Sequence, residues 1–390
     1  MKQVTPNLII KKIQSSIGKG PHVLHEPLFY GNELKYFKES IKKNFVSTSG
    51  PFVKKFEKKI KSYTKTKYPV AVINGTQALF IALKILGIKK NEEVLVPALT
   101  FVGTVNAISY LGAEPHFVDS KISNFGIDCK KLNLYLKKIV KFVGKQSINR
   151  LTGKKIKAII PVHIFGHPCD IEDVIKIAKK YNLSVVEDAA EGLGSFYKKK
   201  HLGTFGDIGC ISFNGNKIVT TGGGGVILTN NKKLARLAKH FVSTAKIPHK
   251  WEYIHDDVGY NFKMPSINAA LGLAQIEKIN FFLNAKKRLY EKYKKQLDNI
   301  EGITLYKSEK HSNSNYWLQT IILDNNKKYL KQKILSLSHK KKIYMRPAWK
   351  LISDLKPYIK KQKMNLSGAR EIYNKAINLP SSQSLMLKKK

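Results

Sequence analysis

Four short segments place residues that could bind or transform a phosphorylated small molecule directly after apolar runs. Asn74-Gly75-Thr76 follows the run 70–73, and Lys217 comes soon after the run 208–213. In open parallel α/β sheets, ligands bind at the carboxyl ends of the strands, so residues at these positions are the first candidates for a site. In chain order, the segments offer a phosphate cradle, an aromatic ring, a carboxylate and a lysine.

The first segment is a candidate phosphate site. Backbone N–H groups where a strand leads into a helix, together with the helix dipole and the Thr76 hydroxyl, favour an anion. A plain helix cap by Asn74 or Thr76, with Gly75 serving the turn, is the simpler interpretation of this segment taken alone.

A second segment, Val185-Val186-Glu187-Asp188, ends an apolar run with two carboxylates. Burying a carboxylate costs free energy unless a cation or a hydrogen-bond donor faces it. Asp188 is therefore expected to pair with a positive group, and a helix cap or a metal ligand would also account for it.

Lys217 differs in context from most lysines of the chain, because it lies in a polar, glycine-rich segment and not on a helix face. Burial there favours the neutral amine that forms an imine with a carbonyl. The glycine run 222–225 would let the backbone pack against a ligand. A P-loop is excluded, because Ile218 follows Lys217 where GxxxxGK[ST] needs Ser or Thr.

Phe101 ends the segment Pro97-Ala-Leu-Thr-Phe101, where its ring could stack on a flat ligand or join the core. A phosphate cradle, a stacking ring, Asp188 and Lys217 together match the chemistry of pyridoxal phosphate. In that chemistry a lysine holds the cofactor as a Schiff base, and an aspartate keeps the pyridine nitrogen protonated.

The elements that must position these residues alternate between strands and helices. Apolar periodicity predicts strands at 70–73, 94–96, 115–118, 158–162, 184–186, 208–213 and 225–228, and helices at 52–63, 78–86, 100–110 and 171–181. Units of this length require a parallel sheet with right-handed crossovers. The basic stretch 137–157 is interpreted as a helix end followed by a surface loop.

Beyond about residue 245 the pattern changes. An irregular loop at 247–265 precedes a long helical region at 266–298, strands at 303–306 and 318–323, and helices at 328–337 and 367–375. This indicates two domains: an N-terminal segment with a large cofactor-binding α/β domain at 1–245, and a linker loop with a small α+β domain at 246–390.

The formal net charge is +43, from 70 Lys+Arg against 27 Asp+Glu. Only five of the 70 cations are arginines, whereas proteins that read bases or bind phosphates bidentately depend on arginine. Many lysines occur in pairs among helix-spaced apolar residues, as on the solvent side of amphipathic helices. A nucleic-acid partner is therefore not expected.

Other sequence features indicate a cytoplasmic protein without a membrane partner or a metal. No window approaches 18 uninterrupted apolar residues, and the N-terminal apolar run of four is too short for a signal peptide. The three cysteines form no zinc-binding pattern, and their sparse, odd number suits a reducing compartment.

From about residue 25 to 380 the chain resembles the DegT/DnrJ/EryC1/StrS sugar aminotransferases. The motifs NGTQAL, PALTF, VVEDAAEGLGS, SFNGNKIVTTGGGG and GYNFKMPSINAALGLAQ occur in that family's order and spacing. The resemblance implies the α/β fold of fold-type I pyridoxal-phosphate-dependent transferases. Its central sheet would be mostly parallel with helices on both faces, and a smaller C-terminal α+β domain would follow.

The resemblance also implies roles for the reactive residues. Lys217 would be the Schiff-base lysine and the acid/base for the 1,3-proton shift, and Asp188 would pair with the pyridinium nitrogen. Glu191 stands where the family usually has Gln or His near the cofactor's phenolic oxygen. A carboxylate at that position would repel a phenolate unless it is protonated or offset by another charge.

Further residues would hold the cofactor from two subunits, again by resemblance. Gly75, Thr76 and Ser212 would bind the phosphate, and Phe101 would stack on the ring. Asn261, in GYNFKM, would reach the phosphate of the neighbouring subunit's cofactor. This implies a homodimer with two shared active sites.

The segments LHEPLFYGNE, FVSTSGPFV, KAIIPVHIFGHPCDIE, RPAWKL and NLPSS resemble the branch that makes UDP-4-amino-4,6-dideoxy-N-acetylglucosamine in legionaminic or bacillosamine-type pathways. The implied substrates are a UDP-linked 4-keto-6-deoxy-N-acetylhexosamine and L-glutamate, with pyridoxamine phosphate formed between the half-reactions. Ser47, Gly50, His163 and Arg346 are candidates for the sugar-nucleotide pocket. Alternatively, His163 supports a neighbouring group by a hydrogen bond, and Arg346 forms an interdomain salt bridge.

Two other functions fit the same motifs. The keto sugar could be GDP- or dTDP-linked, or the chain could be a non-catalytic basic regulator that binds pyridoxal phosphate. Dehydratases of the family typically replace the catalytic lysine with histidine, so Lys217 favours transamination.

Overall fold

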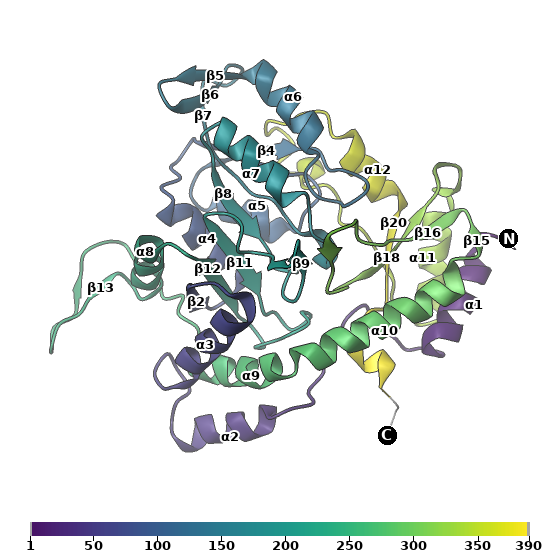
Figure 1. Ribbon diagram of the computed structural model, residues 1–390, viewed down its shortest axis with the longest axis horizontal. Coiled ribbons are helices and arrows are strands. Elements are labelled where there is room, and N and C mark those ends of the chain that lie inside the picture. The colour runs from purple at the N-terminus through teal and green to yellow at the C-terminus, as the bar shows by residue number, and fades with distance from the viewer. Residues whose placement is uncertain (1, 388–390) are drawn as a thin grey trace.

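The computed structural model describes residues 2–387, and a nine-stranded sheet forms its centre (Figure 1). Seven of the strands lie in the order β2 (Tyr68–Val72), β12 (Gly225–Thr229), β11 (Ile208–Ser212), β8 (Ser184–Asp188), β7 (Lys155–Ile159), β3 (Glu93–Pro97) and β4 (Glu114–Val118). The strands from β11 to β4 are parallel, and β12 is antiparallel to both of its neighbours. This confirms the predicted, mostly parallel central sheet.

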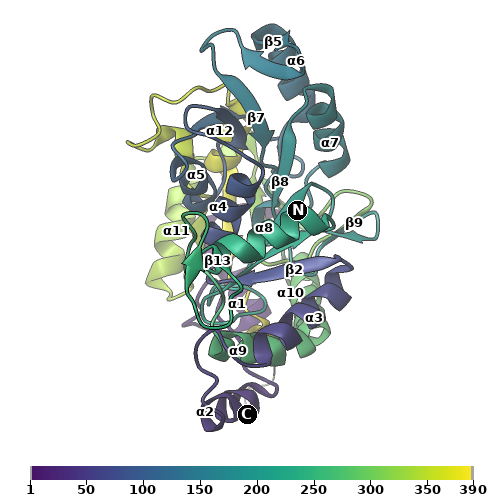
Figure 2. The ribbon, with the colours of Figure 1, turned by 90° about the vertical axis from the view of Figure 1, so that its left-hand side faces the viewer.

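Helices pack on both faces of the sheet because its strands bury both sides. Figure 2 shows α4 (Gly75–Ile85) and α5 (Val102–Ser109) on one side of β7 and β8, and α6 (Cys129–Ile139) and α7 (Ile171–Lys180) on the other. Helices α3 (Phe52–Thr64) and α8 (Lys232–Val242) pack beside β2. In α7, Val174 and Ile177 are buried whereas Lys179 and Lys180 are exposed, so this lysine pair lies on the solvent side as predicted.

A second, antiparallel sheet has the order β16 (Ile303–Leu305), β18 (Gln319–Leu323), β20 (Ala376–Leu379) and β19 (Arg346–Pro347). Near it lie α11 (Leu330–Lys340), α12 (Ser367–Lys375) and the N-terminal helix α1 (Pro6–Ile17). Ile9 and Ile13 of α1 join Leu289, Tyr293 and Ile377 in one hydrophobic cluster. The two ends of the chain therefore share the core of the small domain, and the predicted division between residues 245 and 246 stays a prediction.

Two helices replace the single helical region predicted at 266–298. Helix α9 (Ser266–Glu277) packs on α3 and on α2 (Glu33–Lys42), and α10 (Ile279–Leu297) continues toward the small domain. The break lies at Lys278, whose ψ of 7° departs from helical geometry. Together the two helices connect the large and the small domain.

The prediction of a surface loop within 137–157 was wrong. A hairpin of β5 (Val140–Val143) and β6 (Gln146–Asn149) extends the sheet from β7. Gly144 adopts φ +56°, which a two-residue hairpin turn requires at that position. Three of the four β5 residues are exposed, so the strand lacks the apolar alternation by which strands are recognised.

Short strand pairs complete the fold. They are β1 (Lys2–Gln3) with β15 (Ile300–Glu301), β9 (Phe196–Tyr197) with β10 (Lys200–His201) and β17 (Ser312–Asn313), and β13 (Lys246–Ile247) with β14 (Ile254–His255). The β13–β14 hairpin projects from the large domain beside α8 (Figures 1 and 2). Within residues 2–387, no helix combines the length and apolarity needed to span a membrane.

Candidate active site

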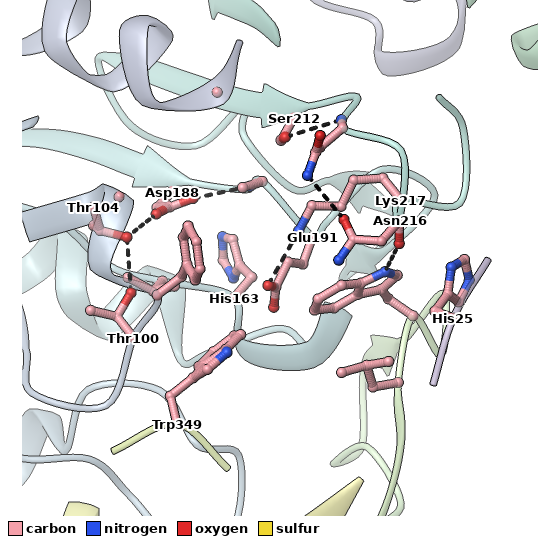
Figure 3. A pocket seen from close by; sticks show the side chains of 18 of the residues that line it. His25, Thr100, Thr104, His163, Asp188, Glu191, Ser212, Asn216, Lys217 and Trp349 are labelled. Atoms are coloured by element: carbon pink, nitrogen blue, oxygen red, sulfur yellow. Dashed lines mark hydrogen bonds and ion pairs between the residues drawn. The ribbon is translucent and has the colours of Figure 1, made fainter. Parts of the chain in front are cut away.

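A cavity of about 680 Å³ lies between the carboxyl ends of the large-sheet strands and the small domain (Figure 3). Nine of the residues predicted from the sequence line it: Gly75, Thr76, Phe101, His163, Asp188, Glu191, Ser212, Lys217 and Arg346. They lie at or just after the carboxyl ends of β2, β3, β7, β8 and β11, or on β19 of the small sheet. The fold thus brings together side chains that are more than 250 residues apart in the chain.

One end of the cavity is the N-terminus of α4, where two glycines allow hydroxyl groups to converge. A Cβ atom on Gly75 would lie 2.8 Å from Cβ of Ser212, and one on Gly103 would lie 2.7 Å from Oγ1 of Thr76. The Asn74 side chain caps the helix, so the cap and a ligand site occur together. A cradle of helix N–H groups and two hydroxyls fits a phosphate, the group that anchors pyridoxal phosphate.

The carboxylate of Asp188 lies in the wall of the cavity at the end of β8. Oγ1 of Thr104 donates to Oδ2 of Asp188 across 2.6 Å, and the N–H of Ala190 donates to Oδ1 across 3.0 Å. Thr100 lies 2.9 Å from the same Thr104 hydroxyl. Burial raises the pKa of Asp188, although these hydrogen bonds oppose the rise. The carboxylate is fixed in orientation and keeps lone pairs for a protonated ring nitrogen.

Lys217 projects into the cavity from the loop after β11. Its Nζ lies 3.9 Å from the centroid of the Trp317 ring and 3.4 Å from Oε1 of Glu191. Nε1 of Trp317 donates to the carbonyl of Asn216 across 2.8 Å, which fixes the indole beside the lysine. A cation over an indole face is an attractive arrangement, so Trp317 holds the amine in place.

The surroundings of Glu191 show how a carboxyl group at this position can avoid repelling an anionic oxygen of a ligand. Burial is the largest influence and raises the pKa of Glu191 to about 7, against the charge of Lys217 and the N–H of Phe165. That N–H donates to Oε2 across 2.7 Å. A carboxyl group with this pKa is readily protonated near neutral pH, and it then does not repel an anionic oxygen. Its place beside a cofactor oxygen stays a prediction.

His163 lines the cavity with both ring nitrogens already engaged by the protein. The N–H of Cys169 donates to Nδ1 across 3.3 Å, so Nε2 carries the proton and donates to Oε2 of Glu187 across 3.2 Å. Burial raises the pKa of Glu187, but the hydrogen bonds from His163 and from backbone amides outweigh burial and hold it below its ordinary value. This geometry does not support a direct hydrogen bond from His163 to a substrate.

Arg346 is exposed and lines the cavity mouth together with Lys350. Within residues 2–387 no carboxylate lies within ion-pair distance of Arg346, so the interdomain salt bridge considered from the sequence is not formed.

The predicted role of the glycine run 222–225 in packing against a ligand was wrong, because these residues do not line the cavity. A Cβ atom on Gly225 would lie 2.6 Å from the backbone of Asn74, so this run permits chain packing instead.

Three predicted residues lie outside the cavity of this chain. The carbonyl of Ser47 accepts from the N–H of Ser266 across 2.5 Å, and Gly50 packs on Phe45 with φ +105°. Asn261 is exposed in the segment between β14 and α9. The substrate roles of Ser47 and Gly50, and the reach of Asn261 to a neighbouring subunit, stay predictions.

Several lining residues were not identified from the sequence. They are His25 of the N-terminal segment and Trp317, Trp349, Lys350 and Asn378 of the small domain. These residues reach the cavity because the N-terminal segment and the small domain pack against the edge of the large sheet. In residues 2–387 there is no group of three or more His, Cys, Asp or Glu side chains that could hold a metal ion.

The chain is similar to known sugar aminotransferases over nearly its whole length. The profile of the DegT/DnrJ/EryC1/StrS aminotransferase family matches residues 29–389. The chain is 36% identical over 362 residues to a GDP-perosamine synthase of Escherichia coli O157:H7, covering 93% of each protein. It is 28% identical to a UDP-4-amino-4,6-dideoxy-N-acetyl-beta-L-altrosamine transaminase of Campylobacter jejuni, over 89% of each. It is 29% identical to a dTDP-4-amino-4,6-dideoxy-D-glucose transaminase of Shigella dysenteriae, over 87% of each.

Solved structures share the fold. The aminotransferase TlmJ from Streptoalloteichus hindustanus superposes with a TM-score of 0.84 over 94% of both chains at 22% identity. Helicobacter pylori PseC, an aminotransferase involved in the biosynthesis of pseudoaminic acid, superposes with a TM-score of 0.82 at 25% identity. That superposition covers 92% of this chain and 93% of PseC. The predicted fold class is confirmed.

Proposed function

Because the chain belongs to the DegT/DnrJ/EryC1/StrS aminotransferase family, we propose that it transfers the amino group of L-glutamate to the 4-keto carbon of a nucleotide-linked 4-keto-6-deoxy sugar. It is a pyridoxal-phosphate-dependent enzyme. One observation carries the proposal: Lys217, Asp188 and the hydroxyls of Thr76 and Ser212 converge on a single cavity. A non-catalytic regulator that binds pyridoxal phosphate would use the same lysine and carboxylate, and the absence of turnover would distinguish it from an enzyme.

Each end of the cofactor has partners in the cavity. Pyridoxal phosphate supplies an aldehyde that an amine can bind covalently and a ring that withdraws electrons from the bonded carbon. The N-terminus of α4, Thr76 and Ser212 would hold its phosphate, and Lys217 would hold its aldehyde carbon. Asp188, oriented by Thr104, would keep a proton on the ring nitrogen.

Lys217 performs the proton transfers once its amine is released. Its Nζ would take the proton from Cα of glutamate and return it to the carbon that the cofactor's aldehyde supplies, and the reverse order would serve the keto sugar. The centroid of the Trp317 ring lies 3.9 Å from the amine, and the ring limits its position. Glu191 places an oxygen 3.4 Å from the amine that can accept or return a proton. Positioned acid–base groups of this kind contribute about 10²–10⁴-fold to a rate.

The second part of the proposal concerns which nucleotide is linked to the acceptor sugar. The motifs of the N-terminal segment and of the tail favour a UDP-linked N-acetylhexosamine. A GDP-linked sugar is the second candidate, favoured by the 36% identity to a GDP-perosamine synthase over 93% of both chains. Arg346 and Lys350 at the cavity mouth would meet the diphosphate in either case, because cationic side chains pair with phosphate oxygens.

A panel of substrates tests the proposed function. The enzyme is first converted by L-glutamate and then offered UDP-, GDP- and dTDP-linked 4-keto-6-deoxy sugars, and the products are identified by mass. One amino sugar is expected, with the UDP-linked N-acetyl form the first candidate. If glutamate alters the bound cofactor but no sugar gains an amine, the proposed acceptor class is wrong.

We also propose a homodimer with shared sites. Trp251, Tyr253 and Val258 on and beside the β13–β14 hairpin are 69%, 81% and 75% exposed. Large apolar side chains gathered on a projecting hairpin are typical of a contact surface. Asn261 follows this hairpin, so a second copy seated there would receive it near its own cavity. The cytoplasmic location stays a prediction, in keeping with three free cysteines.

A further inference from the structure

His25 is a buried histidine that the proposed chemistry does not use. Its side chain lines the cavity and is only 9% exposed, and neither Nδ1 nor Nε2 has a hydrogen-bond partner in the protein. An unpaired polar group in such surroundings is destabilising, so a ligand that pairs with it is favoured. Figure 3 shows His25 at the opposite end of the pocket from Asp188. The ring therefore borders the cavity at the end away from Asp188.

The segment that carries His25 is firmly held. The carbonyl of Leu24 accepts from the N–H of Ser381 across 2.7 Å, and Oγ of Ser382 accepts from the N–H of Glu26 across 3.0 Å. These bonds flank the histidine on both sides. The position of the imidazole is thus set by the backbone of two chain ends and does not depend on a ligand.

The surroundings of His25 keep its ring neutral. Burial lowers the pKa of His25 well below its ordinary value, and the amines of Lys286 and Lys217 lower it further, whereas the nearby backbone of Asn216 raises it. Lys286 is fully buried, and its Nζ donates to the carbonyls of Trp317 and Ser381. A neutral imidazole has one donor and one acceptor, which complements a group that does both.

Asn378 adds a second neutral group to the same cavity. It is buried on β20, and Oγ1 of Thr320 donates to its Oδ1 across 2.7 Å. Among residues 2–387, no hydrogen bond uses Nδ2, which leaves it as a donor for a ligand. Arg346 and Lys350 are available for anionic groups, which leaves His25 and Asn378 for uncharged ones.

We propose that His25 and Asn378 form a hydrogen-bonding subsite for an uncharged substituent of the hexose ring, either a hydroxyl or an acetamido group. The inference rests on the proposed function, since it assigns a part of the acceptor sugar to a part of that cavity. Hydroxyl and secondary amide groups each donate and accept, as the pair requires. L-Glutamate offers no such neutral group, so the subsite distinguishes the two substrates that share the cavity.

The test compares the two half-reactions in His25→Ala, His25→Gln and Asn378→Ala, each loaded with pyridoxal phosphate. The first half-reaction uses L-glutamate, and the second returns the amino group to each nucleotide-linked keto sugar of the panel. Losing a buried hydrogen-bonding group should raise the sugar concentration for half-maximal rate about 10- to 100-fold in His25→Ala. The corresponding glutamate concentration should change less than about 2-fold, and His25→Gln should recover part of the loss.

His22→Ala is the matched control, because His22 lies three residues earlier, its ring hydrogen-bonds only to the carbonyl of Gly18 among the described residues, and it does not line the cavity. A loss confined to the N-acetylated sugar identifies the acetamido group, and an equal loss on the hydroxylated sugars identifies a hydroxyl. Equal losses in both half-reactions, or none with the sugar, would overturn the subsite. A wild-type enzyme that reacts with glutamate but with no sugar would overturn the proposed acceptor, and the subsite with it.

Discussion

Oε1 of Glu191 lies 3.4 Å from Nζ of Lys217, on the same wall of the cavity, while the backbone N–H of Phe165 holds Oε2 at 2.7 Å. The amine and the carboxyl group can therefore share a proton without rearrangement. Since burial raises the pKa of Glu191 to about 7, the pair changes its charge near neutral pH.

Glu191→Gln is predicted to stabilise the cofactor-free protein in a pH-dependent way. The ordinary pKa of 4.5 applies to the unfolded chain, and the folded value is about 7. Ionisation thus favours unfolding as pH rises from 4.5 to 7, on the order of 3 kcal/mol at about 1.4 kcal/mol per pKa unit. The difference in Tm between Glu191→Gln and wild type should grow over this range and level off above it. A difference that is constant from pH 4 to 8 contradicts the prediction.

Lys217→Ala is predicted to abolish the absorbance band of covalently bound cofactor and to lower kcat by at least about 10²–10⁴-fold, because no other amine can replace its proton transfers. Spectra before and after addition of L-glutamate provide the measurement. Lys176→Ala is the control, since Lys176 is exposed and pairs only with Asp173. A variant that keeps both the band and turnover would show that another residue carries the chemistry.

Asp188→Asn and Thr104→Val are predicted to lower kcat to different extents. The asparagine cannot hold a proton on the ring nitrogen, so we expect a loss of about 10²-fold or more. Valine at 104 leaves the charge but removes the donor at 2.6 Å, which should cost about 10-fold. Both are measured as kcat with saturating cofactor, and the exposed Asp173→Asn serves as control. Equal losses in the two variants would mean that orientation, and not charge, is what Asp188 supplies.

Mixing Lys217→Ala with Asn261→Ala is predicted to restore activity if the dimer shares its sites. One site of each mixed dimer combines both substitutions, and the other contains neither. Equal mixing after mild dissociation should give about a quarter of the wild-type activity, because half of the dimers are mixed. Activity that stays at the level of the two separate variants contradicts a contribution of Asn261 across the interface.

The charge of +43 is predicted to raise kcat/KM for the anionic sugar nucleotide at low ionic strength. Raising KCl from about 0.02 to 0.3 M should lower kcat/KM several-fold while kcat stays constant, because screening acts on encounter. Potassium acetate at equal ionic strength controls for specific ion effects. A flat response would make the lysine excess a surface property without a role in substrate capture.

The sequence could predict that residues at strand ends share a site, because the carboxyl ends of parallel strands meet at one edge of the sheet. This holds for any conformation of the connecting loops. That rule placed Asp188 and Lys217 in one site before any distance was known. Trp317 and His25 could not be found this way, because they reach the cavity through docking of the small domain and the N-terminal segment. Strand β5 was not predicted for another reason: Lys141, Phe142 and Val143 are all exposed, so the strand has no alternation of apolar and polar residues.

The bond between Leu24 and Ser381 joins two segments that are far apart in the sequence beside the cavity that Leu24 lines. During synthesis on the ribosome, the large sheet can assemble well before residue 378 emerges, but the wall formed by His25 and Asn378 cannot. A nascent chain that already holds the cofactor's phosphate would still lack a finished acceptor pocket. If His25 and Asn378 form the proposed subsite, selectivity for the sugar is acquired only after residue 378 has joined the fold.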